Sequence, residues 1–148
     1  TQTDNDFQQN AFQTGAENTT AYFSLLKAKK VGVVTNQTGI VRKKSNPNEY
    51  ESLVDFLLEN GISLQRIYAP EHGFRGTADA GEHIKDGKDT KTGLPIISLY
   101  GNNKKPKPEH LEGIDVVVFD LQDVGVRFYT YISTLHYVME ACAEQNIP

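Results

Sequence analysis

Residues 114–119 read Ile-Asp-Val-Val-Val-Phe, and this stretch decides the fold class. It is apolar on both faces of an extended chain, as a central strand of a parallel sheet requires. Residues 31–34, 63–68 and 96–100 predict three further strands, with helical patterns between or after them. Strands that alternate with helices indicate parallel pairing and right-handed crossovers. The sequence therefore predicts an open, mainly parallel α/β sheet.

Two helices are predicted. The first covers residues 49–60, with Asn46 or Asn48 to cap its start and Gly61 just past its end. The second is long and amphipathic. Its apolar stripe consists of Phe128, Tyr131, Ile132, Leu135, Val138, Met139 and Cys142.

The length of 148 residues suits one domain with a single core. Residues 1–20 are polar and predict a flexible lead-in, and residues 21–148 predict the α/β domain. A further strand is expected after the last helix, where the sequence ends, so the sheet is predicted to be incomplete. Thr1 in place of Met indicates either a removed export signal or a trimmed start.

Composition argues against several classes of protein. The net charge is −4 and no basic stripe runs along a helix, so no nucleic-acid partner is expected. No apolar run is long enough for a membrane span. Cys142 is the only cysteine, which excludes a disulfide framework, and its place on the apolar stripe predicts a buried thiol.

Three polar clusters follow three of the predicted strands. They are residues 35–39 (Thr-Asn-Gln-Thr-Gly), 70–76 (Pro-Glu-His-Gly-Phe-Arg-Gly) and 120–127 (Asp-Leu-Gln-Asp-Val-Gly-Val-Arg). Ligands of open parallel sheets bind at the carboxyl ends of the strands, so the three clusters predict one site. The first cluster lacks the glycine patterns of nucleotide-binding loops, and it is either an ordinary polar turn or a ligand contact.

Glu71 and His72 lie between Pro70 and two glycines, in a backbone that is predicted to bend tightly. A partly desolvated Glu71 would have a raised pKa and could serve as a general acid. The structural alternative is that Glu71 pairs with Arg75 while His72 caps a turn.

Arg127 is predicted at the start of the second helix, where the helix dipole disfavours a cation. Either a bound anion or a salt bridge to Asp120 or Asp123 would compensate it. The Tyr129 ring could stack on a sugar, whereas Tyr131 shares the apolar stripe and is expected in the core.

Metal binding is an alternative that involves five side chains without a tight ligand spacing. They are Glu71, His72, Asp79, Glu82 and His83. No metal and no cofactor are expected from this pattern.

Several strings of the sequence resemble one bacterial family, the NamZ-type exo-β-N-acetylmuramidases. They include residues 34–39, 70–76, 92–95, 98–101 and 119–131, in order and with similar spacing, and the resemblance extends from about residue 14 to the end. It implies a Rossmann-like N-terminal domain with helices on both faces of the sheet. A smaller C-terminal domain, absent from this sequence, would complete the active-site cleft.

The resemblance also implies a glycosidase that releases N-acetylmuramic acid from the non-reducing end of peptidoglycan fragments, in cell-wall turnover and recycling. Such a protein is expected to be exported, to the periplasm or outside the cell. Glu71 would be the leading catalytic acid, with His72 and Asp123 beside it. The residues expected around the sugar are Asn36, Arg75, Gln122, Arg127 and Tyr129.

Glycosidases usually use two carboxylates, at a shorter separation for retention than for inversion. The second group could be Asp123, Glu82 or the acetamido group of the substrate itself, and the sequence leaves these open. A module that binds cell-wall sugars without catalysis is the alternative from another functional class, and a metal-dependent hydrolase is a further one.

Overall fold

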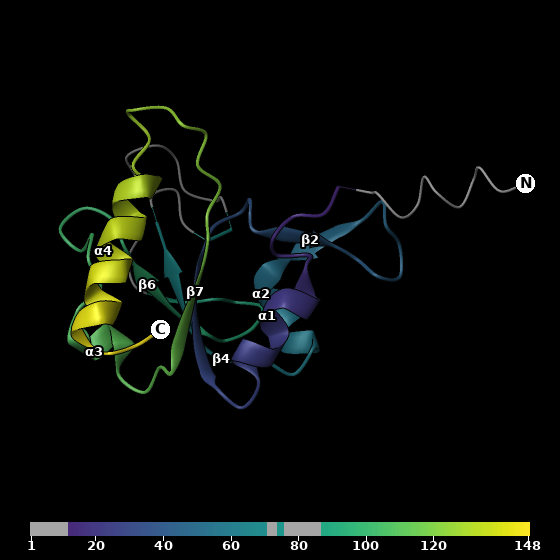
Figure 1. Ribbon diagram of the computed structural model, residues 1–148, viewed down its shortest axis with the longest axis horizontal. Helices are drawn as coiled ribbons and strands as arrows, with labels where there is room; N and C mark the ends of the chain where they lie inside the picture. Colours follow the sequence, from purple (N-terminus) through teal and green to yellow (C-terminus); the bar gives the residue numbers. More distant parts are fainter. Residues whose placement is uncertain (1–11, 71–73, 76–86) are drawn as a thin grey trace, which may run out of the picture.

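The computed structural model describes residues 12–70, 74–75 and 87–148, and its centre is a twisted sheet with helices on both sides (Figure 1). The strands follow the order β5-β6-β4-β1-β7. Their bounds are β1 (Lys30–Thr35), β4 (Ser63–Ala69), β5 (Gly87–Lys88), β6 (Pro95–Ser98) and β7 (Val116–Asp120). β1, β4, β6 and β7 are parallel, and β5 runs antiparallel to β6. The predicted α/β fold is confirmed.

Two hydrophobic cores lie on the two faces of this sheet. On one face, α1 (Thr19–Leu26) and α2 (Leu53–Glu59) bury Leu26, Val54 and Leu57 against β1 and β4. On the other face, α3 (Pro108–Leu111) and α4 (Tyr131–Glu144) cover the sheet, and Cys142 is buried there as predicted. Burial raises the pKa of the Cys142 thiol, which keeps the sulfur protonated and inert.

β7, predicted as a central strand, has one strand neighbour, β1, among the described residues. Among the described strands it lies at the edge of the sheet, and all its residues are half-buried. β1 and β4 occupy the middle instead. The backbone N–H of Val117 donates to the carbonyl of Pro148 at 2.9 Å, so the end of the chain lies beside β7. This is the side of β7 away from β1, where the sequence predicts a further strand after the last helix.

The predicted first helix begins later than expected. Residues 50–52 belong to a small antiparallel hairpin of β2 (Ile40–Arg42) and β3 (Tyr50–Ser52), and α2 starts only after it. The cap is Ser52, whose hydroxyl accepts from the N–H of Val54 at 3.2 Å, and neither Asn46 nor Asn48 has this role. Gly61 follows the helix with a φ of 76°, as its predicted place past the helix end requires.

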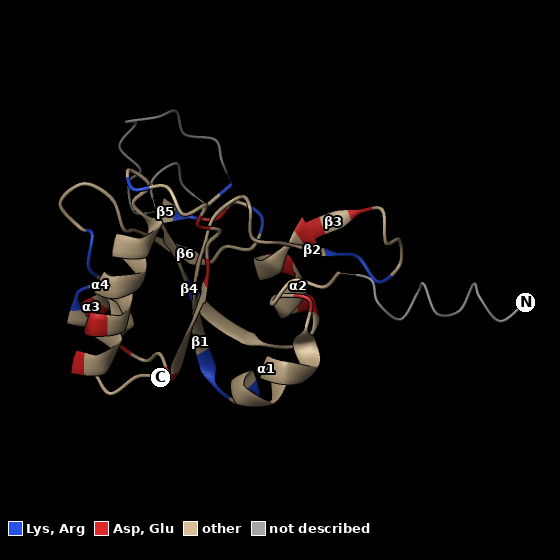
Figure 2. Cartoon of the chain, turned by 45° about the horizontal axis from the view of Figure 1, so that its top comes forward, with Lys and Arg blue, Asp and Glu red and all other residues tan. Residues whose placement is uncertain are grey.

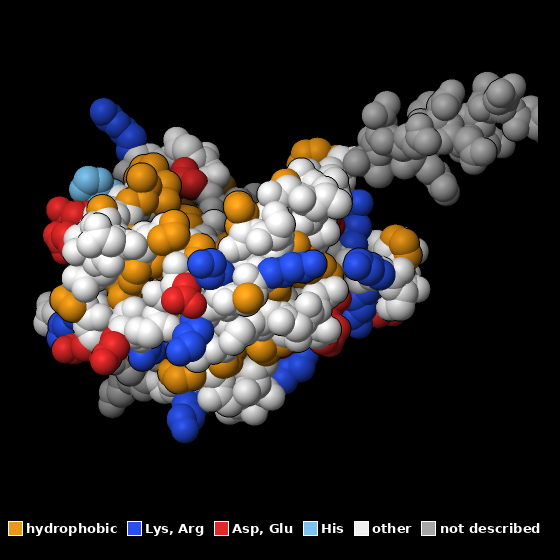
Figure 3. Space-filling view, turned by 60° about the horizontal axis from the view of Figure 1, so that its bottom comes forward, with side chains coloured by type: hydrophobic (Ala, Val, Ile, Leu, Met, Phe, Trp, Pro, Cys, Tyr) orange, Lys and Arg blue, Asp and Glu red, His pale blue; other side chains and the backbone are white. Residues whose placement is uncertain are grey.

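The apolar stripe of the second helix is only partly buried. α4 begins at Tyr131, so Phe128 and Arg127 precede it. Val138 and Cys142 face the core, but Ile132 and Met139 are each 62% exposed. Exposed hydrophobic side chains also gather on the face of the molecule that Figure 3 shows.

The folded part starts before residue 21. α1 begins at Thr19, and the Glu17 carboxylate accepts from the backbone N–H of Arg42 at 3.2 Å. Figure 2 shows the described Lys and Arg positions spread over several elements, interspersed with Asp and Glu. No helix in the described part of the chain is long and apolar enough to cross a membrane.

Candidate functional site

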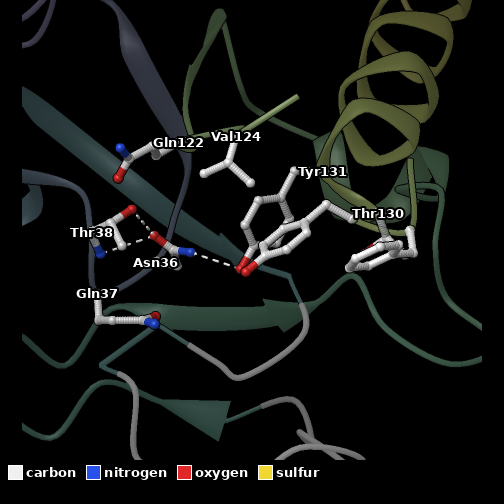
Figure 4. A pocket seen from close by; sticks show the side chains of 9 residues that line it. Asn36, Gln37, Thr38, Gln122, Val124, Thr130 and Tyr131 are labelled. Atoms are coloured by element: carbon white, nitrogen blue, oxygen red, sulfur yellow. Dashed lines mark hydrogen bonds between the residues drawn. The ribbon is translucent and has the colours of Figure 1, made fainter. Parts of the chain in front are cut away.

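The carboxyl ends of β1 and β7 bring two of the predicted clusters together. Thr35 and Asp120, the last residues of the two strands, are direct partners in the parallel ladder. The segments that follow them therefore leave the sheet side by side. They enclose an open cavity of about 380 Å³, shown in Figure 4. Its lining consists of Asn36, Gln37, Thr38, Gln122, Val124, Phe128, Tyr129, Thr130 and Tyr131.

Asn36 is the best-held side chain of this pocket, with only 1% of its surface exposed. Its Oδ1 accepts from the backbone N–H of Thr38 at 3.0 Å and from the Thr38 hydroxyl at 2.7 Å. Its Nδ2 donates to the hydroxyl oxygen of Tyr131 at 3.0 Å, and these bonds are visible in Figure 4. Such a buried, hydrogen-bonded amide is fixed in orientation, as a group that recognises a ligand must be.

Tyr131 was expected in the core, yet it lines the pocket at the first residue of α4. Its apolar spacing hid this role, because the same spacing fits a buried stripe. Thr38 was also missed as a single residue, although it belongs to the first predicted cluster. A short polar residue two positions after an Asn that directly follows a strand is the signal of a turn that closes on the Asn side chain.

Asp120 ends β7 beside this turn. Burial raises the pKa of its carboxyl group. A Cβ atom at Gly39 would lie 3.0 Å from Asp120 Oδ2 and only 2.0 Å from Thr35 Oγ1. Glycine is therefore required at position 39 by close approach, and this contact fixes the turn above the strand ends.

The remaining residues of the third cluster occupy an exposed loop. Gln122 and Tyr129, both predicted around the sugar, line the pocket. Asp123 Oδ1 accepts from the backbone N–H of Gly125 at 2.7 Å and so closes a tight turn. Arg127 is exposed and lies four residues before α4, so the predicted place at the helix start is wrong. Within the described residues it makes no ion pair, including to Asp120 or Asp123.

Arg75, which was predicted around the sugar, is held by acidic residues in the structure. Its Nε and Nη2 donate to the two carboxylate oxygens of Asp89 at 2.7 and 2.8 Å. The hydroxyl of Thr92 donates to Asp89 as well, at 2.6 Å. Arg75 Nη2 also lies 3.5 Å from Asp55 Oδ1, an ionic contact without hydrogen-bond geometry, while Lys91 Nζ donates to Asp55 Oδ2 at 2.6 Å.

This charged cluster anchors the end of the second motif to the sheet. The guanidinium group of Arg75 lies over the ring of the buried Phe74, 4.6 Å from its centre. Hydrogen bonds from Arg75 hold the pKa of Asp89 well below its usual range. Glu71 and His72, which begin the same motif, lie outside the described residues, so their predicted roles stay predictions.

The metal alternative rests mainly on residues outside the described part. Within residues 12–70, 74–75 and 87–148, no three His, Cys, Asp or Glu side chains are grouped to hold a metal ion. Asp79, Glu82 and His83 lie outside these ranges.

Comparison with known families decides the relationship. Residues 31–148 match the family model for the N-terminal part of exo-beta-N-acetylmuramidase NamZ. This chain belongs to the NamZ family. The matched region contains both strands that bear the pocket and all three polar clusters.

A curated relative and two solved structures agree with the NamZ assignment. The chain is 48% identical over 128 residues to peptidoglycan beta-N-acetylmuramidase NamZ of Bacillus subtilis (strain 168), covering 86% of this chain and 30% of the relative. Crystal structures of two DUF1343 family proteins from Bacteroides fragilis NCTC 9343 share the fold. The first has a TM-score of 0.76 at 43% identity, over 91% of this chain and 32% of the other. The second has a TM-score of 0.71 at 41% identity, over 90% and 32%.

Proposed function

We propose that this chain supplies the sugar-binding pocket and the acid-bearing sequence motif of an exo-β-N-acetylmuramidase. The enzyme would release N-acetylmuramic acid from the non-reducing end of peptidoglycan fragments. The observation that carries the proposal is the pocket of amides, hydroxyls and aromatic rings at the carboxyl edge of the sheet, inside the region that matches the NamZ family. The chain spans 30% of the length of the Bacillus relative, so the activity is proposed for the complete polypeptide. A C-terminal domain would close the open side of the pocket.

The lining chemistry suits a sugar. Asn36, Thr38 and Gln122 offer both donors and acceptors to ring hydroxyls and to an acetamido group. Tyr129 offers an aromatic face to the C–H face of the ring. The described lining contains no charged side chain, which fits the neutral body of an N-acetylated sugar.

Glycoside hydrolysis needs an acid that protonates the leaving oxygen. We assign this role to Glu71, with His72 as its neighbour, because the family resemblance places both in the motif that Arg75 anchors. The group on the other side of the sugar is Asp123, Glu82 or the substrate's own acetamido oxygen. Asp123 has one carboxylate oxygen bound by Gly125, which leaves its second oxygen for such a role.

A chromogenic muramide tests the activity in the full-length protein. Free N-acetylmuramic acid should appear with the wild type, and Glu71→Gln should lower kcat by about 100-fold or more when the leaving group needs protonation. The matched control is Glu109→Gln, in α3 at the opposite end of the sheet, which should keep normal kcat (Figure 1). Near-normal turnover by Glu71→Gln would remove Glu71 from the role of proton donor.

We propose that Arg127 binds the lactyl carboxylate of muramic acid. N-acetylglucosamine lacks this carboxylate. Arg127 is an exposed cation in the loop that lines the pocket. Arg127→Ala should reduce the preference for muramides over glucosaminides, measured as the ratio of kcat/KM values. An unchanged ratio would show that the carboxylate is recognised elsewhere.

Because its proposed substrates are peptidoglycan fragments, we propose that the enzyme acts in cell-wall turnover and recycling. We also propose that it is exported to the periplasm or the medium. Fractionation of cells that express the full-length protein tests this location. Enzyme activity confined to the cytoplasmic fraction would contradict it.

A non-catalytic cell-wall sugar-binding module is the second candidate. One observation favours it, namely that the described lining of the pocket contains no carboxylate. The two functions differ in the muramide assay. A binding module would bind the muramide without hydrolysing its glycosidic bond. Glu71→Gln would then leave the affinity for the muramide unchanged.

A further inference from the structure

Three aromatic rings form a row that leads out of the pocket. The Tyr131 and Tyr129 rings are 6.1 Å apart, centre to centre, at an angle of 74°. The Tyr129 and Phe128 rings are 6.2 Å apart at 36°. Tyr131 is half-buried and fixed by Asn36, Tyr129 is 44% exposed, and Phe128 is 83% exposed. The row therefore begins at Tyr131, which is hydrogen-bonded to Asn36, and ends at the exposed ring of Phe128.

Phe128 is displayed by an ordered turn. The backbone N–H of Tyr129 donates to the carbonyl of Val126 at 2.9 Å, and Asp123 closes the preceding turn through Gly125. Phe128 has no polar atom that would gain from water. Within this chain a large apolar ring thus lies at the rim of a polar pocket, a position that suits a ligand contact.

We propose that Phe128 and Tyr129 form an aromatic shelf that receives a second sugar ring, next to the sugar held at Asn36. The inference rests on the proposed function and deepens it, because it makes a disaccharide the smallest well-bound substrate. The C–H face of a β-linked N-acetylhexosamine lies against the rings, while its hydroxyl and acetamido groups stay in water. The first sugar occupies the polar end, where Asn36 and Gln122 are found.

The composition of the lining favours a sugar over a protein partner at the shelf. The rings and the amides of Asn36, Gln37 and Gln122 share one cavity, without a charged side chain among its described lining residues. Alternating polar and aromatic groups suit a carbohydrate, which has hydroxyls around its rim and C–H groups on its faces. A protein partner would need a contiguous apolar area at the centre of its interface.

Sugar titrations of the full-length protein test the shelf with three variants. The probes are free N-acetylmuramic acid, the disaccharide in which it is β-linked to N-acetylglucosamine, and the methyl β-glycoside of N-acetylglucosamine. Glu71→Gln serves as background with the disaccharide, to prevent turnover. Phe128→Ala should weaken disaccharide binding about tenfold and leave the affinity for free N-acetylmuramic acid unchanged. Phe128→Trp should retain the disaccharide affinity.

The matched control is Ile132→Ala, which also removes an exposed apolar side chain, 62% exposed, but one outside the pocket lining. It should leave all three affinities unchanged. Residues 1–148 contain no tryptophan, so Phe128→Trp also introduces a local fluorophore. Its emission in the chain of residues 1–148 should shift when the disaccharide is added.

Equal affinities of the wild type and Phe128→Ala for the disaccharide would overturn the shelf. The shelf would also be overturned if Phe128→Ala lost affinity equally for free N-acetylmuramic acid and for the disaccharide and had a lower melting temperature. Phe128 would then contribute to the packing of the fold. The two proposals fail in different ways. If the methyl glycoside binds in a Phe128-dependent way but no muramide is hydrolysed, the aromatic shelf is supported and the proposed enzyme activity is contradicted. If muramide is hydrolysed and Phe128→Ala binds the disaccharide normally, only the shelf falls.

Discussion

Arg75 donates to both carboxylate oxygens of Asp89, through Nε at 2.7 Å and Nη2 at 2.8 Å. The pair joins the end of the 70–76 motif to the segment just before β6, and Asp89 is only 3% exposed. Two parallel hydrogen bonds between a guanidinium and a carboxylate fix the orientation of both groups. The pair therefore fixes Arg75, which belongs to the same sequence motif as the proposed acid Glu71.

Asp89→Asn should destabilise the protein by about 2–3 kcal/mol, because it breaks a largely buried, hydrogen-bonded charge pair. The free energy of unfolding in urea measures the effect. Glu49→Gln is the matched control, since it breaks the exposed pair of Lys43 and Glu49 and should destabilise the protein clearly less than Asp89→Asn does. Equal losses for the two variants would show that the Arg75–Asp89 pair adds no more than a surface contact.

Acidification should remove the stabilising effect of the same pair. Arg75 holds the pKa of Asp89 below its usual range, and the unfolded value is about 3.9, so the carboxylate stabilises the fold at neutral pH. This stability is fully present above the unfolded pKa and is lost as pH falls through the lower folded pKa. The difference in unfolding free energy between wild type and Asp89→Asn should therefore be constant from about pH 8 to 5 and narrow below about pH 4. A gap that widens on acidification would contradict this assignment.

Gly39→Ala should destabilise the turn above the strand ends by about 1–3 kcal/mol, because the added Cβ would overlap Thr35 Oγ1. Chemical denaturation measures the loss. The control is Gly15→Ala, where a Cβ meets no atom within 4 Å. Adding Thr35→Ala removes the overlapping oxygen, so the double variant should be more stable than the sum of the two single effects predicts. Strict additivity would show that the overlap is not the cause.

Tyr131→Phe should release the Nδ2 group of Asn36 and leave a buried donor without its partner. We expect a loss of about 1–2 kcal/mol in unfolding free energy, together with weaker binding of N-acetylmuramic acid. Tyr50→Phe, at a residue that is 53% exposed on β3, is the control and should change neither quantity. Normal sugar affinity in Tyr131→Phe would mean that the orientation of Asn36 does not govern recognition.

The fold could be predicted wherever the local pattern has one meaning. Residues 31–34 and 63–68 became β1 and β4, since a short extended run that ends in a turn has few other solutions. Position within the sheet could not be predicted for β7, because residue type reports which faces are apolar and not which edges are paired. The start of α4 was missed for a related reason. Phe128 lies three residues before Tyr131, which fits helical spacing, and Thr130 provides no side-chain cap to mark the boundary.

The candidate site was predicted to the extent that it depends on strand ends. Asn36 and Gln122 share a pocket because β1 and β7 are parallel neighbours, and parallel pairing follows from the alternation of strands and helices. The acidic partner of Arg75 could not be predicted from the sequence. Asp89 lies 14 residues further along the chain, and nothing in the local sequence marks it as the carboxylate that binds Arg75.

The bond from Val117 N–H to the Pro148 carbonyl has a practical consequence for preparing this chain. Any residues that follow Pro148 start beside β7, the last strand of the described sheet on this side, whose outward backbone groups can pair with an extended segment. In a parallel ladder the N–H two residues along, at Phe119, points to the same side as that of Val117. An affinity tag fused at this end could therefore become an artificial neighbour of β7, and purification tags belong at the other terminus.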